Sequence, residues 1–344
     1  MSNRRSLPTD EYHVGVVCAL HHEMTAVIAM LDEEDEPLKS QDAHDNNSYV
    51  LGRIGPHDVV VACLPAGVYG TVSAATVAKD MLRTFTGLRF GLLVGIGGGI
   101  PNPRNGRDVR LGDIVVSQPE DTFGGVVQYD LFKNLGKGKF KRKGSLNSPP
   151  PLLLAALASL RTKSDLQGSQ VPKYLTEMNQ KHPSLKDNGY ASPGVSMDHL
   201  HCSKCDPSRW WWVFWLLILW LCPLLRCEMC ENGEVLRSSR RHENPVVHYG
   251  TILSANQVVK DAGVRDQLGQ EFNALCVEME AAGLMNNFPC IAVRGVCDYA
   301  DSHKNDGWQK YAAAAAAAYA KWFLGHVTPQ QTANERRIQE VVGK

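Results

Sequence analysis

Short apolar runs that stop abruptly at polar residues or glycine are the feature that most constrains how this chain folds. Residues 13–20 (HVGVVCAL) are rich in β-branched side chains and are followed at once by His21, His22 and Glu23. Similar runs occupy residues 90–94, 114–117, 248–254 and 290–296. Continuous apolar runs of this length are typical of buried parallel strands. We therefore expect a sheet of buried strands whose ends carry the functional residues.

Turn residues and helical stretches separate these strands. Residues 49–54 and 57–63 flank Gly55-Pro56, a turn-forming dipeptide, and are expected to form a hairpin. An Ala-rich amphipathic helix over about 72–84 joins this hairpin to the strand at 90–94 and completes a strand–helix–strand unit. Further helices are expected over 152–160, 173–181 and 311–324, the last with seven consecutive alanines. The pattern predicts an α/β fold with a mixed sheet.

Composition narrows the class of partner. Lys plus Arg and Asp plus Glu are equal at 36 each, so the chain has no net charge with which to attract nucleic acid or an anionic membrane. Ten cysteines in 344 residues do not make a disulfide scaffold, and five of them lie in apolar runs, which suits buried thiols in a reducing compartment. Residues 1–11 are polar and lack the apolar stretch of a secretory signal. We expect an intracellular, cytoplasmic protein that binds neither nucleic acid nor membrane.

One segment is foreign to an ordinary α/β chain. Trp210 to Leu225 (WWWVFWLLILWLCPLL) holds five of the seven tryptophans. Its sixteen residues, with a proline near the end, fall short of the roughly 20 apolar residues that a spanning helix requires, which disfavours a membrane span. Two interpretations remain: an interfacial or partner-binding surface, and a hydrophobic insertion without catalytic role, such as a translated intron or a gene-model error.

Four cysteines flank that segment with a spacing close to that of a zinc ribbon. Cys202 and Cys205, then Cys227 and Cys230, form two C-x2-C pairs that offer four thiolates to a tetrahedral Zn²⁺. The apolar run separates the two pairs, so closure on one ion and four unliganded thiols both stay open. A structural zinc is therefore a hypothesis, and no metal is expected in the active site.

A glycine-rich segment follows the buried run at 90–94. Gly95 to Gly99 do not match a dinucleotide-binding fingerprint, because Ile100 stands where that motif requires Gly or Ala. We predict a glycine turn at the end of a strand. It serves either as a tight turn only or as a place where the backbone approaches a ligand closely.

Charged residues mark the ends of two further apolar runs. Glu278 and Glu280 are two residues apart where a helix or a bent strand begins, and we expect at least one of them to face a ligand. The alternative is an acidic residue that stabilises a helix N-terminus. Arg294 and Asp298 lie at the end of another buried strand, and buried strands seldom carry charge without a reason.

Five motifs occur in a fixed order along the chain: V-G-V-V-C-A-L with Glu23, V-G-I-G-G-G, L-G-D-I-V-V-S, V-E-M-E-A-A-G and V-R-G-V-C-D. In this order they resemble the nucleoside phosphorylase and nucleosidase superfamily, in particular methylthioadenosine and adenosylhomocysteine nucleosidases. The motifs P-A-G-V-Y-G-T, H-Y-G-T-I and C-D-Y-A-D-S-H-K-N resemble a eukaryotic branch found alone or at the N-terminus of receptor-like multidomain proteins. The resemblance covers about residues 13–324.

The resemblance implies a three-layer α/β/α fold with a central mixed, twisted sheet. We expect this domain at residues 12–325, with an atypical Cys/Trp-rich insertion at about 200–245. A disordered N-terminus at 1–11 would precede it, and a polar, loose tail at 326–344 would follow it.

The resemblance also implies roles for the charged residues. Departure of a purine leaves an oxocarbenium-like ribosyl centre, so the reaction needs an acid for the base, a nucleophile and a held sugar. Asp298 is the implied acid for purine N7; burial would let it hold a proton, and such help is worth about 10²–10⁴ in rate. Glu280 would bind the ribose hydroxyls, and Met279 would pack on the sugar. Arg294 would orient Glu280 or the nucleophilic water, or serve only as a buried ion-pair partner.

Glu23 favours hydrolysis over phosphorolysis. Phosphorylases of this superfamily place a G-D-P-x-R-type turn after the first strand, whereas this chain has A-L-H-H-E-M at 19–24. A carboxylate there repels phosphate by roughly 4 kcal/mol per like-charge pair at about 4 Å and an effective dielectric near 20, yet it can orient and deprotonate water. We expect a nucleosidase, with a phosphate-dependent purine nucleoside phosphorylase as the alternative.

Other residues bear on the base and on the 5′ substituent. Gly67, Gly97 and Gly98 are expected in the base or phosphate pocket. Where bacterial nucleosidases carry an aromatic residue that stacks on the base, this chain has A-N-Q-V at 255–258, and Asn256 or Gln257 is expected to bond purine edges. A group of basic residues has two interpretations: contacts with a 5′-phosphate, which would make AMP or ATP alternative substrates, or positions in solvated loops. These residues are Arg104, Arg107, Arg110, Lys133, Lys137, Lys139, Lys141, Arg142 and Lys143.

The sequence therefore predicts a purine nucleosidase, with adenine as the expected base. It is expected to need no cofactor for catalysis and to form a homo-oligomer, as members of the superfamily commonly do. The competing hypothesis is a non-catalytic nucleotide-sensing or oligomerisation module whose Trp-rich segment is the partner surface. Intact candidates for the acid, the nucleophile and the sugar-binding residue argue against it.

Overall fold

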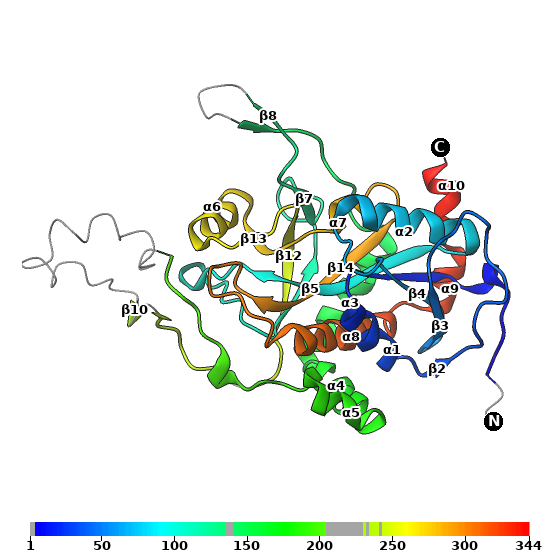
Figure 1. Cartoon of the computed structure of the whole chain (residues 1–344), viewed down its shortest axis with the longest axis horizontal. Helices are drawn as coiled ribbons and strands as arrows, with labels where there is room; N and C mark the ends of the chain where they lie inside the picture. The colour runs from blue at the N-terminus through cyan, green and yellow to red at the C-terminus, as the bar shows by residue number, and fades with distance from the viewer. Residues whose placement is uncertain (1–3, 135–139, 204–229, 232–233, 241–242, 344) are drawn as a thin grey trace, which may run out of the picture.

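A mixed sheet runs through the centre of the molecule (Figure 1). The computed structural model describes residues 4–134, 140–203, 230–231, 234–240 and 243–343. The strands lie in the order β13 (Ala274–Glu278), β12 (Val247–Ser254), β6 (Ile114–Ser117), β14 (Cys290–Asp298), β5 (Phe90–Gly99), β1 (Val14–Cys18), β4 (His57–Cys63), β3 (Tyr49–Ile54) and β2 (Glu33–Glu34), and β7 (Val126–Gln128) pairs with β12.

The strand pairing mixes parallel and antiparallel neighbours, and β14 pairs antiparallel with β6 inside the sheet. β1 lies between β4 and β5 and is parallel to both, and β5 is parallel to β14. β3 and β4 form the antiparallel hairpin that Gly55-Pro56 predicts. At the other end, β13 pairs with β12 in parallel and with β5 in antiparallel fashion, so β5, β14, β6, β12 and β13 close into a ring. This closure brings the ends of distant strands to one place.

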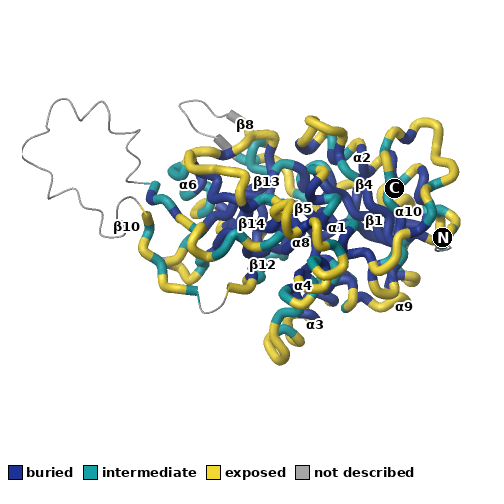
Figure 2. The backbone as a smooth tube through the Cα atoms, turned by 60° about the horizontal axis from the view of Figure 1, so that its bottom comes forward, coloured by how far each residue is buried: buried dark blue, intermediate teal, exposed yellow. Residues whose placement is uncertain are grey.

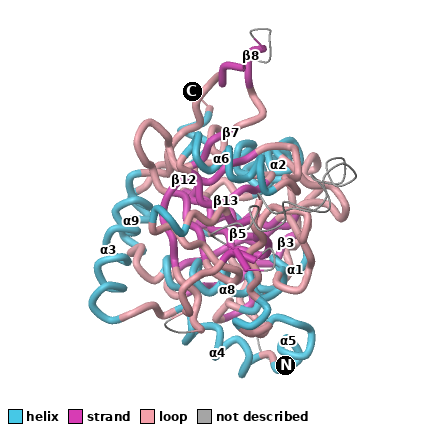
Figure 3. The backbone as a smooth tube through the Cα atoms, turned by 90° about the vertical axis from the view of Figure 1, so that its left-hand side faces the viewer, coloured by secondary structure: helices cyan, strands magenta, loops and turns pink. Residues whose placement is uncertain are grey.

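Helices cover both faces of the sheet (Figure 3). One layer contains α1 (His21–Ala29), α8 (Gln309–Leu324), α3 (Pro151–Gln167) and α4 (Val171–Lys181), which pack around α8. The other contains α2 (Thr71–Thr84) and α7 (Ala281–Leu284), with α6 (Ala262–Phe272) against β13. The three-layer α/β/α fold with a central mixed sheet is therefore confirmed.

Short elements complete the described chain. They are the hairpins β8 (Phe132–Asn134) with β9 (Phe140–Arg142) and β10 (Cys230–Glu231) with β11 (Glu234–Val235), and the helical turns η1 (Thr9–Glu11), η2 (Pro103–Asn105), α5 (Pro183–Leu185), η3 (Lys186–Tyr190), η4 (Val195–Met197), α9 (Pro329–Asn334) and α10 (Ile338–Val342).

The alanine-rich helix α8 is the central packing element of its layer. All seven alanines from Ala312 to Ala318 are buried, and Figure 2 shows α8 within the buried interior. A Cβ on Gly295 of β14 would overlap the carbonyl oxygen of Ala312. Small side chains on the helix and a glycine on the strand therefore let the two backbones approach closely, as dense core packing requires.

The glycine-rich segment is a strand and not the turn that the sequence predicted. β5 continues from Phe90 to Gly99, and its last residues pair with both β13 and β14. A Cβ on Gly97 would lie 2.5 Å from the Cys276 sulfur. The glycines thus allow two neighbouring strands to close on β5, a tertiary requirement that local turn propensity does not reveal.

Residues near both ends of the described chain contact the rest of the fold. Arg5, in the segment expected to be disordered, forms ion pairs with Asp35 and Asp58. In the tail that was expected to be loose, Ile338 is fully buried and its N–H donates to the carbonyl oxygen of Leu88 at 2.8 Å. The mobility of both segments stays a prediction. Among the described helices, none has the length and apolar content to cross a membrane.

Candidate active site

A cavity of about 340 Å³ lies where β1, β5, β13 and β14 end. Segments from both halves of the chain meet there because the closed part of the sheet gathers their ends. Ligands of open α/β sheets bind at this kind of position. The carboxylates that line the cavity are Glu23, Glu278, Glu280 and Asp298, and Gly97, Gly98, Met279 and Gln257 line it too.

Glu23 is held at the cavity by backbone donors. It lies in the first turn of α1, and its Oε2 accepts hydrogen bonds from the N–H groups of Ala19 (2.7 Å) and Leu20 (2.9 Å), while Oε1 accepts one from Ile96 (2.8 Å). Burial raises the pKa of Glu23, and this outweighs the lowering by Arg294 and by the three backbone donors. A fixed carboxyl group with a raised pKa suits the orientation and deprotonation of a water molecule.

Arg294 organises the carboxylates from beneath the cavity. It is fully buried on β14; its Nη2 pairs with Glu278 and lies 3.3 Å from Oε2 of Glu280. Burial lowers the pKa of Arg294, but the surrounding carboxylates outweigh this and raise it. A Cβ on Gly95 would overlap the guanidinium and reach within 2.5 Å of Oε1 of Glu23, so glycine makes room for the cluster. Arg294 does not line the cavity and acts through the carboxylates it holds.

Glu278 and Glu280 have different tasks. Glu278 Oε2 accepts hydrogen bonds from the N–H groups of Glu280 (3.1 Å) and Ala281 (3.0 Å), so it caps the start of α7 besides pairing with Arg294. The sequence did not reveal Glu278 as the main partner of Arg294, since either glutamate suited the motif. Glu280 accepts a hydrogen bond from the N–H of Gly70 at 3.2 Å and lines the cavity beside Met279.

The pKa of Glu280 is raised to about 7. Burial is the largest cause, Arg294 acts in the opposite direction, and the like charges of Glu278 and Glu23 add to the increase. Near neutral pH this carboxyl therefore changes readily between donor and acceptor. A ribose hydroxyl, which is both a donor and an acceptor, is a suitable partner for it.

Asp298 also lines the cavity and has an ion-pair partner that the sequence pattern does not indicate. Nζ of Lys304 is 3.0 Å from its Oδ2, and the N–H of Ala300 donates to Oδ1 at 2.8 Å. The thiol of Cys297 donates to Oδ2 at 3.0 Å. Lys304 lies within the motif C-D-Y-A-D-S-H-K-N, but its spacing from Asp298 does not indicate this contact, which depends on the path of the loop between β14 and α8.

The three glycines expected at the pocket are separated by the structure. Gly97 and Gly98 line the cavity, and a Cβ on Gly98 would lie 2.9 Å from Oδ1 of Asp298. Gly67 lies outside this lining, contrary to expectation, and Tyr69 of the same loop lines the cavity instead. The side chain of Tyr69 is exposed at the cavity mouth, where it can contact a ligand or a second protein.

Asn256 also differs from expectation, because its side chain is already engaged. Its Oδ1 accepts hydrogen bonds from the N–H of Thr71 (2.9 Å) and from the Thr71 hydroxyl (3.0 Å), at the first turn of α2. It therefore caps a helix from a distant loop and does not line the cavity. Its neighbour Gln257 does line the cavity and stays a candidate for contact with the base.

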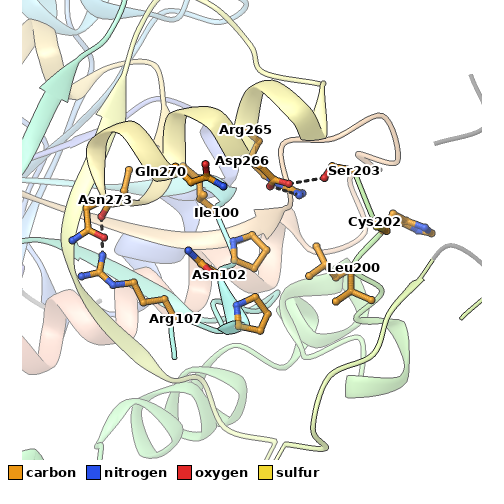
Figure 4. Close-up of a pocket in the computed structure, with 16 residues that line it drawn as sticks. Ile100, Asn102, Arg107, Leu200, Cys202, Ser203, Arg265, Asp266, Gln270 and Asn273 are labelled. Atoms are coloured by element: carbon orange, nitrogen blue, oxygen red, sulfur yellow. Dashed lines mark hydrogen bonds and ion pairs between the residues drawn. The ribbon is translucent and has the colours of Figure 1, made fainter. Parts of the chain in front are cut away.

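The basic residues expected to contact a phosphate lie away from the active-site cavity, as far as their side chains are described. Arg107 pairs with Glu120 at 2.5 Å, and Arg110 pairs with Asp108 at 2.5 Å. Arg107 lines a second cavity of about 190 Å³, where its guanidinium also donates to the carbonyl oxygen of Asn273 (Figure 4). The other basic residues with described side chains, Lys133, Arg142 and Lys143, do not line the active-site cavity, while Arg104, Lys137, Lys139 and Lys141 fall where side chains are not described.

The zinc hypothesis falls largely outside the described residues. Cys202 is buried and lines the second cavity, whereas Cys205, Cys227 and the Trp-rich run lie in the range 204–229. In the part of the chain that the structure describes, no group of His, Cys, Asp and Glu side chains is arranged to hold a metal ion. A structural zinc held by Cys202, Cys205, Cys227 and Cys230 stays a hypothesis.

Comparison with known proteins finds similarity in sequence over part of the chain and in fold over most of it. Residues 220–323, which include β12, β13, β14 and most of α8, match the family model of the phosphorylase superfamily. The fold is also that of solved nucleosidases. Futalosine hydrolase of Helicobacter pylori is 16% identical with a TM-score of 0.54, over 92% of this chain and 98% of that one. The carboxyl-terminal third of the chain thus matches the phosphorylase superfamily, and the fold is shared with this hydrolase.

Two further relatives add detail. A putative 5′-methylthioadenosine/S-adenosylhomocysteine nucleosidase from Borrelia burgdorferi B31, solved bound to adenine, is 17% identical with a TM-score of 0.55, over 91% of this chain and 99% of that one. A nucleotide-binding leucine-rich repeat (NLR)-like protein of Hyaloscypha variabilis is 45% identical over 95% of this chain. The chain spans 30% of the length of that protein, in line with the resemblance to multidomain receptor-like proteins.

Proposed function

We propose that this protein cleaves the N-glycosidic bond of a purine nucleoside or nucleotide, with water as the nucleophile and adenine as the expected base. The observation that carries the proposal is the cavity itself. Glu23, Glu280 and Asp298 line it together, and the buried Arg294 pairs with Glu280. N-glycosidic cleavage needs several such groups at one place, because the sugar gains positive charge while the base must gain a proton.

Each residue then has one task. Glu23 orients and deprotonates the water that attacks C1′, Glu280 accepts hydrogen bonds from the ribose hydroxyls, and Met279 packs on the sugar. Asp298 delivers a proton to N7, so that the C1′–N9 electron pair leaves on a neutral base. The carboxylates around C1′ also stabilise the positive charge that develops there.

The charges at the cavity favour water over phosphate. A phosphate at the nucleophile position would face the Glu23 carboxylate, a like-charge contact that costs roughly 4 kcal/mol at about 4 Å in an effective dielectric near 20. Among the described side chains, the lysines that line the cavity are Lys260 and Lys304, and Lys304 is paired with Asp298. A phosphate-dependent purine nucleoside phosphorylase is therefore the alternative within the enzyme class.

The test is release of purine base from adenosine, inosine, methylthioadenosine, AMP and ATP, followed by chromatography with and without phosphate. Asp298→Asn and Glu23→Gln should each lower the rate by about 10²–10⁴. Glu177→Gln, on the exposed surface of α4, is the matched control and should retain full activity. Release that depends on phosphate would instead establish the phosphorylase.

The similarity to an NLR-like protein favours one candidate of another class, a non-catalytic nucleotide-sensing or oligomerisation module. Exposed Val68, Tyr69 and Val72 beside the cavity give such a module, or a homo-oligomeric enzyme, an apolar contact surface. Folded protein that binds a purine nucleotide but releases no base from any of the five substrates would support the binding module. Sedimentation of the same sample measures the oligomeric state.

A further inference from the structure

The ion pair between Asp298 and Lys304 is the feature of the cavity that the proposed mechanism leaves unexplained. The Asp298 side chain is 3% exposed and that of Lys304 is 30% exposed, and both line the cavity. Asp298 is the last residue of β14, and Lys304 lies on the connection from β14 to α8. Ala300, between them, has a φ of +50°, an uncommon value for a residue with a side chain. A strained backbone at this point indicates that the loop is held in place for the contact it makes.

The hydrogen bonds at Asp298 present a conflict with its task. Both oxygens accept: Oδ1 from the N–H of Ala300, and Oδ2 from the Lys304 ammonium and the Cys297 thiol. A carboxyl group surrounded by donors in this way is an acceptor, whereas an acid for N7 must carry a proton. The proton therefore has to come from a neighbour, and Lys304 is the charged donor in contact with Asp298.

We propose that Lys304 supplies the proton that Asp298 delivers to the leaving base, an inference that rests on the proposed function. A proton first moves from Nζ of Lys304 to Oδ2 of the Asp298 carboxylate. Asp298 then donates this proton to N7 and returns to the carboxylate form. The C1′–N9 bond breaks with its electron pair on the base, and water forms the new bond to C1′. The water loses one proton, solvent returns one to the neutral Lys304 amine, and the charges balance. Lys304 acts through Asp298 and is a positioning residue for that proton.

The timing follows from the chemistry of the base. N7 of an intact purine nucleoside is a weak base, and it becomes strongly basic only as the C1′–N9 electron pair moves onto the ring. Burial lowers the pKa of Lys304, but Asp298, Cys297 and Asp306 outweigh burial and raise it. Lys304 therefore keeps its proton in the resting protein and gives it up when the leaving base demands it. Water would otherwise have to enter the cavity to reprotonate Asp298.

The other charged groups near the pair do not replace Lys304. Behind it, a smaller cavity shared with Asp298 is lined by Asp301, His201 and His303. His201 stacks on His303 with ring centroids 3.6 Å apart, and burial lowers the pKa of His201, so this imidazole is neutral near pH 7. On β13, the Cys276 thiol interacts electrostatically with both Asp298 and Lys304, and burial raises its pKa, so it is not an acid near neutral pH.

The test uses two substitutions that separate charge from proton supply. Lys304→Gln removes both, whereas Lys304→Arg keeps the positive charge but cannot release a proton. With adenosine, or whichever purine substrate the wild type cleaves, both variants should lower kcat by about 10² or more while KM changes little. The pH profile of kcat is measured alongside, and wild-type activity should persist into the alkaline range where Lys304→Gln has lost it.

A second substrate isolates the proton. The 4-nitrophenyl riboside releases an anion that needs no protonation, so both variants should cleave it at the wild-type rate. Full kcat of Lys304→Arg on the purine substrate, or an unchanged pH profile in Lys304→Gln, would overturn the proposal, because charge or solvent would then suffice. Equal losses on both substrates would reduce Lys304 to a structural role. Absence of base release by the wild type would refute the proposed function and, with it, this inference.

Discussion

Removal of the buried guanidinium of Arg294 should lower the free energy of unfolding by a measurable amount. Arg294 is fully buried and pairs with Glu278 and Glu280, whose side chains are 1% and 7% exposed. Arg294→Met keeps the volume of the stem but leaves these two carboxyl groups without their cation. Breaking a buried ion pair on one side costs about 3–5 kcal/mol, chiefly because the remaining charge stays buried and unpaired.

The corresponding shift in melting temperature is modest because the chain is large. At about 2.1 cal/mol/K per residue, unfolding 344 residues has an entropy near 0.7 kcal/mol/K, so a loss of about 4 kcal/mol lowers Tm by roughly 5–6 °C. Urea unfolding at pH 7 measures the free energy directly. Arg83→Met, which removes a half-exposed partner of Asp80, is the matched control and should cost at most about 1 kcal/mol.

A double-mutant cycle checks the physical cause. Glu278→Gln keeps the oxygen that caps α7 but removes the charge, so adding it to Arg294→Met should recover part of the lost stability, with an interaction energy of about 0.5–3 kcal/mol. If Arg294→Met unfolds within about 1 kcal/mol of the wild type, the carboxyl groups do not depend on this guanidinium and the reasoning fails.

Three further predictions follow from the same contacts. The pKa of Glu280 is raised to about 7 from its ordinary 4.5, so the folded protein binds this proton more tightly than the unfolded chain does. The contribution of Glu280 to the free energy of unfolding should be greatest below about pH 4.5 and should fall as the pH rises toward 7. Urea unfolding of the Glu280→Gln variant should lack this pH dependence. Asn256→Ala removes the cap on Thr71 and should cost about 1 kcal/mol in the same assay, while preference among purine bases stays unchanged; altered base preference would restore its predicted role in recognition. Gly97→Ala would press a methyl group on Cys276 and should cost about 1–3 kcal/mol, and an unchanged Tm would show that β13 moves freely away from β5.

The helices and strands could be predicted from the sequence wherever local chemistry decides the structure. The hairpin at Gly55-Pro56 and strands such as β1 and β12 agree with prediction to within about two residues at each end, because apolar runs and turn residues act locally. The glycine segment is the exception. It was predicted to be a turn and is the end of β5, since what glycine satisfies there is the close approach of Cys276 from another strand.

The candidate site divides in the same way. The sequence by itself determined which charged side chains are the candidates: Glu23, Glu280 and Asp298 near the ends of apolar runs, and Arg294 in another apolar run. Only the tertiary structure decided the partners. Arg294 pairs with Glu278 as well as with Glu280, Asn256 caps a helix, and Lys304 lies 3.0 Å from Asp298. An ion pair depends on how loops fold over a closed sheet, and a pattern of residue types along the chain does not contain that distance.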